Sequence, residues 1–356
     1  MAYTAIDDPS AHFHIQLYTG DGSANNAITN DANAGDFQPD LVWIKNRDAI
    51  DSHCLFDSTR GATKVIHSDT DAAEATDADT LDSFASDGFQ VDADVKVNTN
   101  TEAYVAWQWK ANGGSRSTFA EDGDNPGGGY QVNTTAGFSI VDYTGTGANG
   151  TIAHGLGAIP HCMIVKNRSL DDLRYWAVYN IGLDFPTDDL VYLDESSAGN
   201  DHDPTWNDTA PTSSVFTVGT YHSTNEDGES FVAYLWTPIQ GYSKFGSYTG
   251  NASTDGTFVY LGFKPAWLLI KRTDGSGNWI LIDTKRDTHN VSFKDLNADR
   301  NAAEGGTAYY NMDLLSNGVK FRNLNAETNG SGTTYVYMAF AEQPFVTSGG
   351  VPCTAR

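Results

Sequence analysis

The sequence predicts an all-β protein made of three tandem β-sandwich repeats of the jelly-roll or lectin-like kind. Composition is the first reason: 35 glycines stand against 11 prolines and 4 methionines in 356 residues, and 39% of the residues are hydrophobic. Such a chain has apolar material for packed cores and the turn residues that short strands need. The other reasons are short apolar runs bounded by Gly, Asn and Asp, and their recurrence three times along the chain.

Three marks recur in the same order at nearly constant spacing. Each repeat opens on a Tyr-Thr-Gly motif, continues with a proline and an apolar run that ends in a lysine, and closes on an aromatic segment. An arginine follows each lysine by one or two residues. The opening motifs start at Tyr18, Tyr143 and Tyr248; the apolar runs span 39–45, 160–166 and 265–271; the arginines are Arg47, Arg168 and Arg272; the closing segments span 104–109, 231–236 and 335–340.

The elements of each repeat follow from these marks. An alternating strand comes first, at 13–18, 138–143 and, in part, 258–263. The apolar run suits a strand buried on both faces, and the lysine at its end is expected to extend its charge to solvent. The aromatic segment is expected to lie in the core. Only residues 77–86 favour a helix, of one or two turns. Further strands are expected at 55–56, 176–179, 279–283, 88–91, 215–218 and 318–321.

These elements divide the chain into five parts. Residues 1–112, 134–238 and 239–343 are predicted to be β-sandwich repeats 1, 2 and 3. Residues 113–133 read as a flexible glycine-rich linker, because they contain Gly113-Gly114 and Asn125-Pro-Gly-Gly-Gly129. Residues 344–356 read as an extended C-terminal tail.

The net charge of the chain limits the classes of partner that it is expected to bind. A formal charge of −25, from 46 acidic and 21 basic residues, disfavours nucleic acid and anionic membrane surfaces. No apolar run approaches the length of a membrane span, and the N-terminal residues lack the pattern of a secretion signal. Residues 1–115 carry 19 acids and 6 bases, residues 116–240 carry 17 and 4, and residues 241–356 carry 10 and 11. The third repeat is therefore expected to face a different neighbour from the other two.

The motifs that resemble catalytic or cofactor sites fail on inspection. The Gly-rich stretch 145–150 matches a dinucleotide fingerprint, but no helix pattern follows it. The acidic stretch 69–79 lacks the glycine and glutamate of an EF-hand loop, so calcium is an open but secondary alternative. His12 and His14 have no third ligand nearby, and the three cysteines are expected to be free thiols. No candidate acid–base group recurs at matched positions. We therefore expect no enzyme, no metal and no cofactor.

Loops that belong to one repeat only are the candidates for binding. Repeat 2 carries Trp206 and His202 in one loop and Tyr221 and His222 in another. Aromatic rings beside histidine, aspartate and asparagine are typical of sugar-binding surfaces and also of protein interfaces. These four residues are the predicted ligand or interface site.

Several segments resemble a family of virion proteins from marine tailed bacteriophages. The resemblance rests on segments 104–114, 241–251, 263–272 and 344–348 and covers nearly the whole chain. It implies a tail-fibre-like or structural protein of the virion, made in the host cytoplasm and released by lysis. Because the shared motifs are packing and turn motifs, the resemblance implies a fold and a setting but no catalytic residue.

Three functions compete at this point. The first is a non-enzymatic virion protein that forms an oligomeric appendage of the tail or its fibres, with a trimer favoured. It would bind other virion proteins and contact host surface glycan. The second is a capsid decoration or tail-assembly component without a ligand. The third and remotest is a glycan depolymerase, which needs two carboxylates about 5–9.5 Å apart in a cleft.

Overall fold

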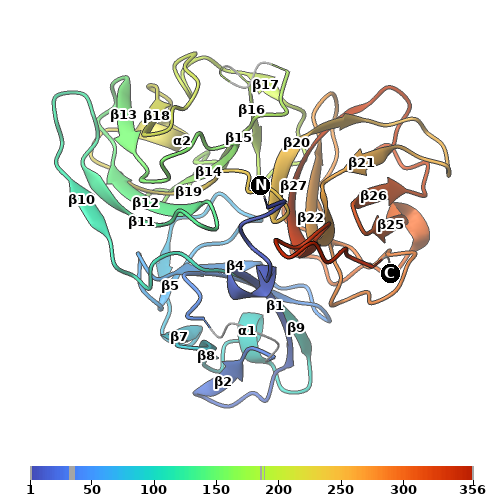
Figure 1. Ribbon diagram of the computed structural model, residues 1–356. Coiled ribbons are helices and arrows are strands. Elements are labelled where there is room, and N and C mark those ends of the chain that lie inside the picture. Colours follow the sequence, from blue (N-terminus) through green and yellow to red (C-terminus); the bar gives the residue numbers. More distant parts are fainter. Residues whose placement is uncertain (1, 32–36, 185–186, 188, 355–356) are drawn as a thin grey trace.

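The computed structural model describes residues 2–31, 37–184, 187 and 189–354 and confirms the all-β class (Figure 1). Each repeat contributes one larger antiparallel sheet. In repeat 1 its order is β1 (Phe13–Thr19), β9 (Ala103–Trp109), β3 (Leu41–Asn46) and β4 (Cys54–Asp57). In repeat 2 it is β10 (Ser117–Phe119), β11 (Gly128–Asn133), β12 (Phe138–Thr144), β19 (Ser230–Trp236), β14 (Cys162–Asn167), β15 (Ala177–Asn180), β16 (Asp189–Tyr192) and β17 (Asn200–Asp201). In repeat 3 it is β20 (Ser243–Thr249), β27 (Thr334–Pro344), β22 (Phe263–Arg272), β23 (Ile280–Asp283) and β24 (Leu296–Asn297).

A smaller sheet packs on the outer face of each larger one. These sheets are β2 (Asn26–Thr29), β8 (Gly88–Val91) and β7 (Leu81–Ala85) in repeat 1; β13 (Gly150–Ala153) and β18 (Val215–Val218) in repeat 2; and β21 (Phe258–Tyr260), β26 (Gly318–Phe321) and β25 (Met312–Leu315) in repeat 3. A further pair is β5 (Lys64–Val65) with β6 (Ala75–Thr76). The helical segments are η1 (Pro9–Ala11), α1 (Val95–Asn98), α2 (His222–Asn225) and η2 (Ala308–Tyr310).

Two predicted elements are wrong. Residues 77–86 form no helix; β7 occupies 81–85 and pairs with β8, so sheet pairing outweighs the local helical preference. Residues 258–263 are not the first strand of repeat 3 either. They are divided between β21 and β22 by Gly262, whose φ of +82° breaks the extended path, and β20 takes the first position instead.

The predicted linker and tail are both more structured than expected. Within 113–133, β10 and β11 extend the sheet of repeat 2 by pairing onto β12. The tail beyond β27 turns back on itself, since Cys353 N–H donates to the Phe345 carbonyl and Thr347 N–H to the Val351 carbonyl. It is not extended. Ser348 also donates its backbone N–H to Asp7, at 2.5 Å, so the N-terminal segment and the C-terminal tail contact each other.

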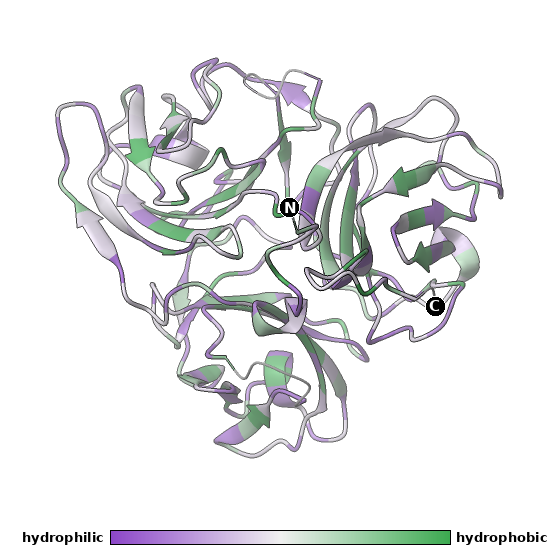
Figure 2. Ribbon diagram, in the orientation of Figure 1, coloured by the Kyte–Doolittle hydropathy of each residue, from purple (hydrophilic) through white to green (hydrophobic). Residues whose placement is uncertain are grey.

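The larger sheets are buried on both faces because alternate residues serve two different cores. On β9, Tyr104 and Ala106 point toward the smaller sheet of repeat 1. Val105, Trp107 and Trp109 point the other way, into a central cluster to which all three repeats contribute. Figure 2 shows this apolar character along the strands of all three larger sheets. The repeats thus have cores of their own and one core in common.

The three repeats surround this shared core as a closed ring (Figure 1). The aromatic strands β9, β19 and β27 are buried, as predicted, and each lies inside its sheet between the opening strand and the strand of the apolar run. The N-terminal segment runs across the ring near its centre, where Thr4 Oγ1 donates to the Gln240 carbonyl.

Candidate functional site

One structural position ties each repeat to another. The residue before β4, β15 and β23 is His53, Trp176 or Trp279, and each is buried with its ring N–H aimed across a repeat boundary. Trp176 Nε1 donates to the His67 carbonyl at 2.9 Å and Trp279 Nε1 to the Tyr192 carbonyl at 2.7 Å. His53 Nδ1 accepts from Trp43, so His53 Nε2 carries the proton that it shares with the Asn297 carbonyl, 2.9 Å away. Repeat 2 is thereby bonded to repeat 1, repeat 3 to repeat 2, and repeat 1 to repeat 3.

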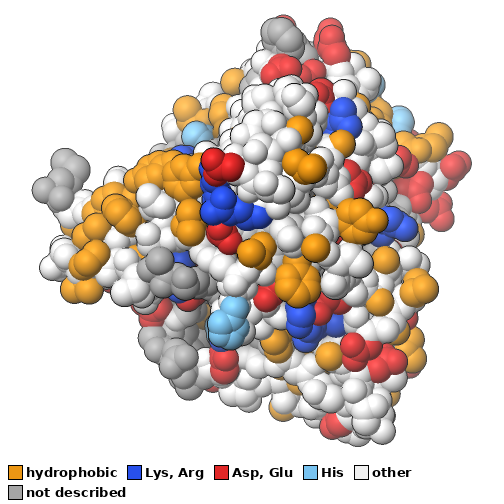
Figure 3. Space-filling model, turned by 90° about the vertical axis from the view of Figure 1, so that its right-hand side faces the viewer, with side chains coloured by type: hydrophobic (Ala, Val, Ile, Leu, Met, Phe, Trp, Pro, Cys, Tyr) orange, Lys and Arg blue, Asp and Glu red, His pale blue; other side chains and the backbone are white. Residues whose placement is uncertain are grey.

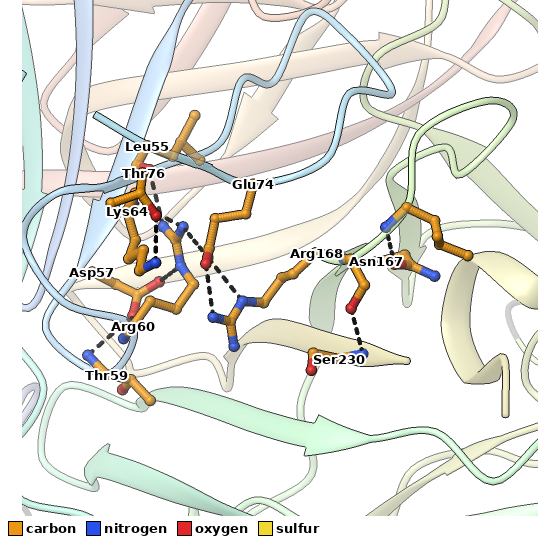
Figure 4. A network of polar contacts seen from close by, with 12 residues as sticks. Leu55, Asp57, Thr59, Arg60, Lys64, Glu74, Thr76, Asn167, Arg168 and Ser230 are labelled. Carbon is orange, nitrogen blue, oxygen red and sulfur yellow. Dashed lines mark hydrogen bonds and ion pairs between the residues drawn. The ribbon is translucent and has the colours of Figure 1, made fainter. Parts of the chain in front are cut away.

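A buried ion pair reinforces the boundary between repeats 1 and 2 (Figure 4). Asp57 and Arg60 have fully buried side chains and form a charge-assisted hydrogen bond. Tyr234 of repeat 2 donates its hydroxyl to Asp57 Oδ2 at 2.7 Å. Glu74 accepts from Arg60 at 3.1 Å and from Arg168 of repeat 2 at 2.9 Å. Two arginines and two carboxylates therefore neutralise one another at this boundary.

The boundary between repeats 3 and 1 carries the same arrangement. Asp283 pairs with Arg286 at 2.5 Å, and both side chains are fully buried. Trp107 of repeat 1 donates its indole N–H to Asp283 Oδ2 at 3.0 Å, in the position that Tyr234 takes at the other boundary. Glu304 accepts from Arg286 at 3.2 Å and from Arg47 of repeat 1 at 2.8 Å.

The boundary between repeats 2 and 3 lacks these charges. Asn180 and Leu183 stand where the other repeats have aspartate and arginine, and Asn180 Nδ2 donates to the Tyr337 carbonyl at 3.3 Å. Gly199, whose N–H donates to the Thr273 carbonyl, stands where the others have glutamate. The remaining arginine, Arg272, pairs with the nearby Asp274 instead. The same contact between repeats is therefore made with buried charges at two boundaries and without them at the third.

The recurrent lysines do not reach solvent, contrary to the expectation. Lys45, Lys166 and Lys271 are fully buried, and the ammonium groups donate to backbone carbonyls. Lys166 reaches the Asp71 carbonyl of repeat 1 at 2.8 Å and Lys271 the Glu195 carbonyl of repeat 2 at 3.1 Å. Burial lowers the pKa of each lysine to about 8.

Acidic groups also recur at matched positions, which the sequence reasoning missed. Asp69, Asp194 and Asp299 each accept the backbone N–H of the residue before β4, β15 or β23, at 3.0, 3.0 and 2.9 Å. Burial raises the pKa of Asp194 to about 7 and of Asp299 to about 6. The signal is hidden because the spacing from the residue before the strand to the aspartate grows from 16 to 18 to 20 residues. These carboxylates hold the starts of the strands in place, and their raised pKa values come from burial in that structural position.

Three of the four predicted site residues do meet on repeat 2. The Tyr221 ring lies 4.4 Å from the His202 ring and 4.4 Å from the His222 ring, centroid to centroid. The Tyr221 hydroxyl is 3.0 Å from the hydroxyl of Tyr192, whose ring lies 5.0 Å from that of Tyr175. All five residues are half-buried, so each of them is partly accessible to solvent. We call these five residues the aromatic–histidine cluster.

Trp206, the fourth predicted residue, is not part of this surface. It is 1% exposed and packs in the core of repeat 2, with its ring 6.1 Å from that of Tyr179. The prediction of an exposed Trp206 is wrong, because the loop carries it inward beneath the smaller sheet.

Cys54 and His67 lie close together in repeat 1 without forming a thiolate–imidazolium pair. Cys54 Sγ lies 3.8 Å from His67 Nδ1, but that nitrogen donates to the His53 carbonyl at 2.7 Å and cannot accept the thiol proton. Burial also raises the pKa of Cys54 well above its usual value, which leaves an inert thiol. The central cavity is apolar, and its free volume of about 10 Å³ is the space of a single water molecule.

The acidic stretch 69–79 has structural partners. Asp71 Oδ2 accepts the Leu173 N–H of repeat 2 at 2.9 Å, and Asp77 Oδ1 accepts the Asp79 N–H at 3.0 Å. Within the described ranges, no group of three or more His, Cys, Asp or Glu side chains is placed to hold a metal ion. Among the helices of the described chain, none has the length and apolarity to cross a membrane.

Comparison with known proteins gives a family without a known activity. A family model described as a domain of unknown function (DUF7483) matches residues 8–344, which takes in all three repeats. No curated protein matches the chain. The match treats the three repeats as one unit, as the shared central core does.

Proposed function

We propose that this chain, which belongs to the DUF7483 family of unknown function, is a non-enzymatic structural protein of a bacteriophage virion. In this proposal it forms an appendage of the tail or tail fibre, is made in the host cytoplasm, and binds other virion proteins and host surface glycan. The virion setting rests on the resemblance of its sequence to marine phage proteins. Oligomerisation, with a trimer favoured, belongs to the same proposal.

The observation that carries the proposal is that the buried ion pairs join one repeat to another. Arg60, Arg286 and their carboxylate partners take part in contacts that bond one repeat to another. Such a ring resists deformation, which suits a particle component more than an enzyme that must open and close. The aromatic–histidine cluster lies on the outside of this ring, where rings and polar atoms could meet a sugar.

The alternatives make different demands. A capsid decoration or assembly component needs no ligand, so the aromatic–histidine cluster would then have no binding role. A glycan depolymerase needs a cleft lined by two carboxylates. Asp194 and Asp299, two carboxylates with raised pKa values, instead accept the backbone N–H groups of the residues that precede β15 and β23.

A binding experiment tests the glycan part of the proposal. The full chain would be immobilised and probed with polysaccharide from the surface of susceptible cells, and then with intact cells. We expect Tyr221→Ala to weaken binding roughly tenfold, the usual effect of removing one stacking ring. Tyr309→Ala is the matched control, because Tyr309 is a 65% exposed tyrosine on repeat 3. Equal binding by both variants would remove the cluster from the proposal.

A second experiment tests the setting. Quantitative mass spectrometry and electron microscopy of purified particles would locate the protein and give its copy number. A small number of copies at the tail is expected, whereas hundreds of copies on the head would favour the decoration alternative. Absence from the particle would refute both.

A further inference from the structure

Repeat 3 presents two aromatic side chains to solvent from the edge of its smaller sheet. β21 has one neighbour, β26, so its other edge is unpaired by any described strand. Its central residue, Val259, is buried, whereas Phe258 and Tyr260 on either side are 42% and 49% exposed. Both rings therefore lie on the outer face of the sheet.

The other two repeats show that the fold does not need these rings. The strand that pairs with β21 in repeat 3 corresponds to β8 in repeat 1 and to β18 in repeat 2. Phe258 pairs with Lys320, the third residue of β26, and the third residues of β8 and β18 pair with Ala27 and Thr151. Phe258 therefore corresponds to Ala27 and Thr151. In the same way, Tyr260 aligns with Thr29 of repeat 1 and Ala153 of repeat 2. Small residues occupy both positions in repeats 1 and 2. The aromatic pair is thus a feature of repeat 3 that its packing does not require.

The exposed rings continue into a larger patch at the chain termini. The Tyr3 hydroxyl is 3.4 Å from the Tyr260 hydroxyl, and the Tyr3 ring lies 6.3 Å from the ring of Phe345. Val351, in the turned-back tail, is 63% exposed. We call Phe258, Tyr260, Tyr3, Phe345 and Val351 the repeat-3 aromatic patch. Figure 3, which views the molecule from the side of repeat 3, shows hydrophobic side chains gathered along one margin of this face.

Cations flank the patch. Lys244 Nζ lies 5.3 Å from the centroid of the Tyr260 ring and donates to the Tyr260 carbonyl at 2.6 Å. Lys320 stands opposite Phe258 on β26 and pairs with Asp255 at 2.9 Å. The surrounding residues 241–356 have a net charge of +1, from 11 bases and 10 acids, in a chain of −25. Aromatic residues are enriched in the cores of protein interfaces, and polar residues form the surrounding rim.

We propose that the repeat-3 aromatic patch binds an acidic repeat of a second copy of this chain. An acidic occupant fits the lysines beside the patch, Lys244 and Lys320, and residues 1–115 and 116–240 of a second copy each carry a net charge of −13. Two acidic repeats repel each other, whereas a contact between an acidic repeat and the lysine-flanked patch of repeat 3 does not meet this repulsion. The contact joins two different surfaces, so copies associate head to tail and can close into a ring such as a trimer. The inference does not depend on glycan binding.

Sedimentation of the full chain over a range of concentrations tests the proposal. We expect the wild-type chain to self-associate. The double variant Phe258→Thr/Tyr260→Ala, which borrows small residues from the matched positions, should raise the dissociation constant roughly tenfold or more, because it removes two aromatic anchors. It should unfold like the wild type, since repeat 2 folds with such residues. Tyr309→Ala, an exposed aromatic outside the patch, should associate normally.

Cross-linking between isotopically labelled and unlabelled copies identifies the partner surface. Lysine-to-carboxylate links between copies are expected from Lys244 or Lys320 to acidic residues of repeats 1 and 2. A monomeric wild-type chain at every concentration would overturn the proposal, as would links from repeat 3 only to repeat 3. Equal association of the double variant would also overturn it. Loss of glycan binding in the double variant, without any self-association of the wild type, would reassign the patch to glycan.

Discussion

The buried pair of Asp57 and Arg60 provides a quantitative test of how the repeats are joined. Replacing Arg60 by Leu leaves the Asp57 carboxylate fully buried without its cation, although Tyr234 still donates to it. Breaking one side of a buried ion pair costs about 3–5 kcal/mol of unfolding free energy. Asp57→Asn should cost a similar amount, because it leaves the guanidinium buried without its nearest charge.

The double variant Asp57→Asn/Arg60→Leu should behave differently. It reproduces the residues that repeat 2 has at the same place, Asn180 and Leu183, where the asparagine accepts the Gly182 N–H and donates across the boundary. Both charges disappear together, so we expect a stability within about 2 kcal/mol of the wild type. The residual loss has a clear source, because the Leu55 and Lys64 carbonyls lose the hydrogen bonds from Arg60.

Urea unfolding followed by tryptophan fluorescence and by circular dichroism measures all four chains. Unchanged m-values would show that the compared states are the same. A double variant whose loss equals the sum of the two single losses would refute the reasoning, since independent sites add and a compensating pair does not.

Three further variants test separate features. Trp206→Ala should cost about 3–5 kcal/mol in urea unfolding, because it empties a core position; a loss of binding with unchanged stability would contradict its burial. The folded state holds the Asp194 proton up to about pH 7 and the unfolded state releases it near its ordinary pKa, so stability falls between these values as pH rises. The variant Asp194→Asn should therefore gain stability relative to the wild type from pH 4.5 to pH 7, and a constant difference would contradict the raised pKa. Gly182→Ala should destabilise by about 1–3 kcal/mol, because its Cβ would lie 2.3 Å from the Gly246 carbonyl carbon of repeat 3. Gly306→Ala is its control, since the added Cβ meets nothing within 4 Å, and equal melting temperatures would argue against the close approach.

The recurrence of motifs predicted the repeats and their central strands, because strand periodicity and aromatic content are local properties. It could not predict that the repeats surround one core. The residues 105 and 107 look like any inward strand face, and only the tertiary arrangement directs them toward the other repeats. The same holds for Lys45, since solvent exposure at a strand end is decided by what packs over it.

The candidate site was predictable where ring-bearing residues lie close along the chain. Tyr221 and His222 are neighbours in the chain, whereas His202 precedes Tyr221 by 19 residues and comes beside it only after the chain has returned through β18. The prediction for Trp206 was wrong because the composition of a loop does not show whether a side chain points inward or toward solvent. Tyr192 and Tyr175 were missed because they come from other elements of repeat 2 and join the cluster only through folding.

The bond between Trp107 and Asp283 has a consequence for synthesis, because 176 residues separate its two partners in the chain. A ribosome that adds roughly 5–20 residues per second needs roughly 9–35 s to span that distance. During this interval the central face of the first repeat, with three of its tryptophans, remains uncovered by the third. The newborn chain therefore passes through a period of exposed apolar surface that ends only when its last third emerges, and premature termination there would leave a fragment prone to aggregation.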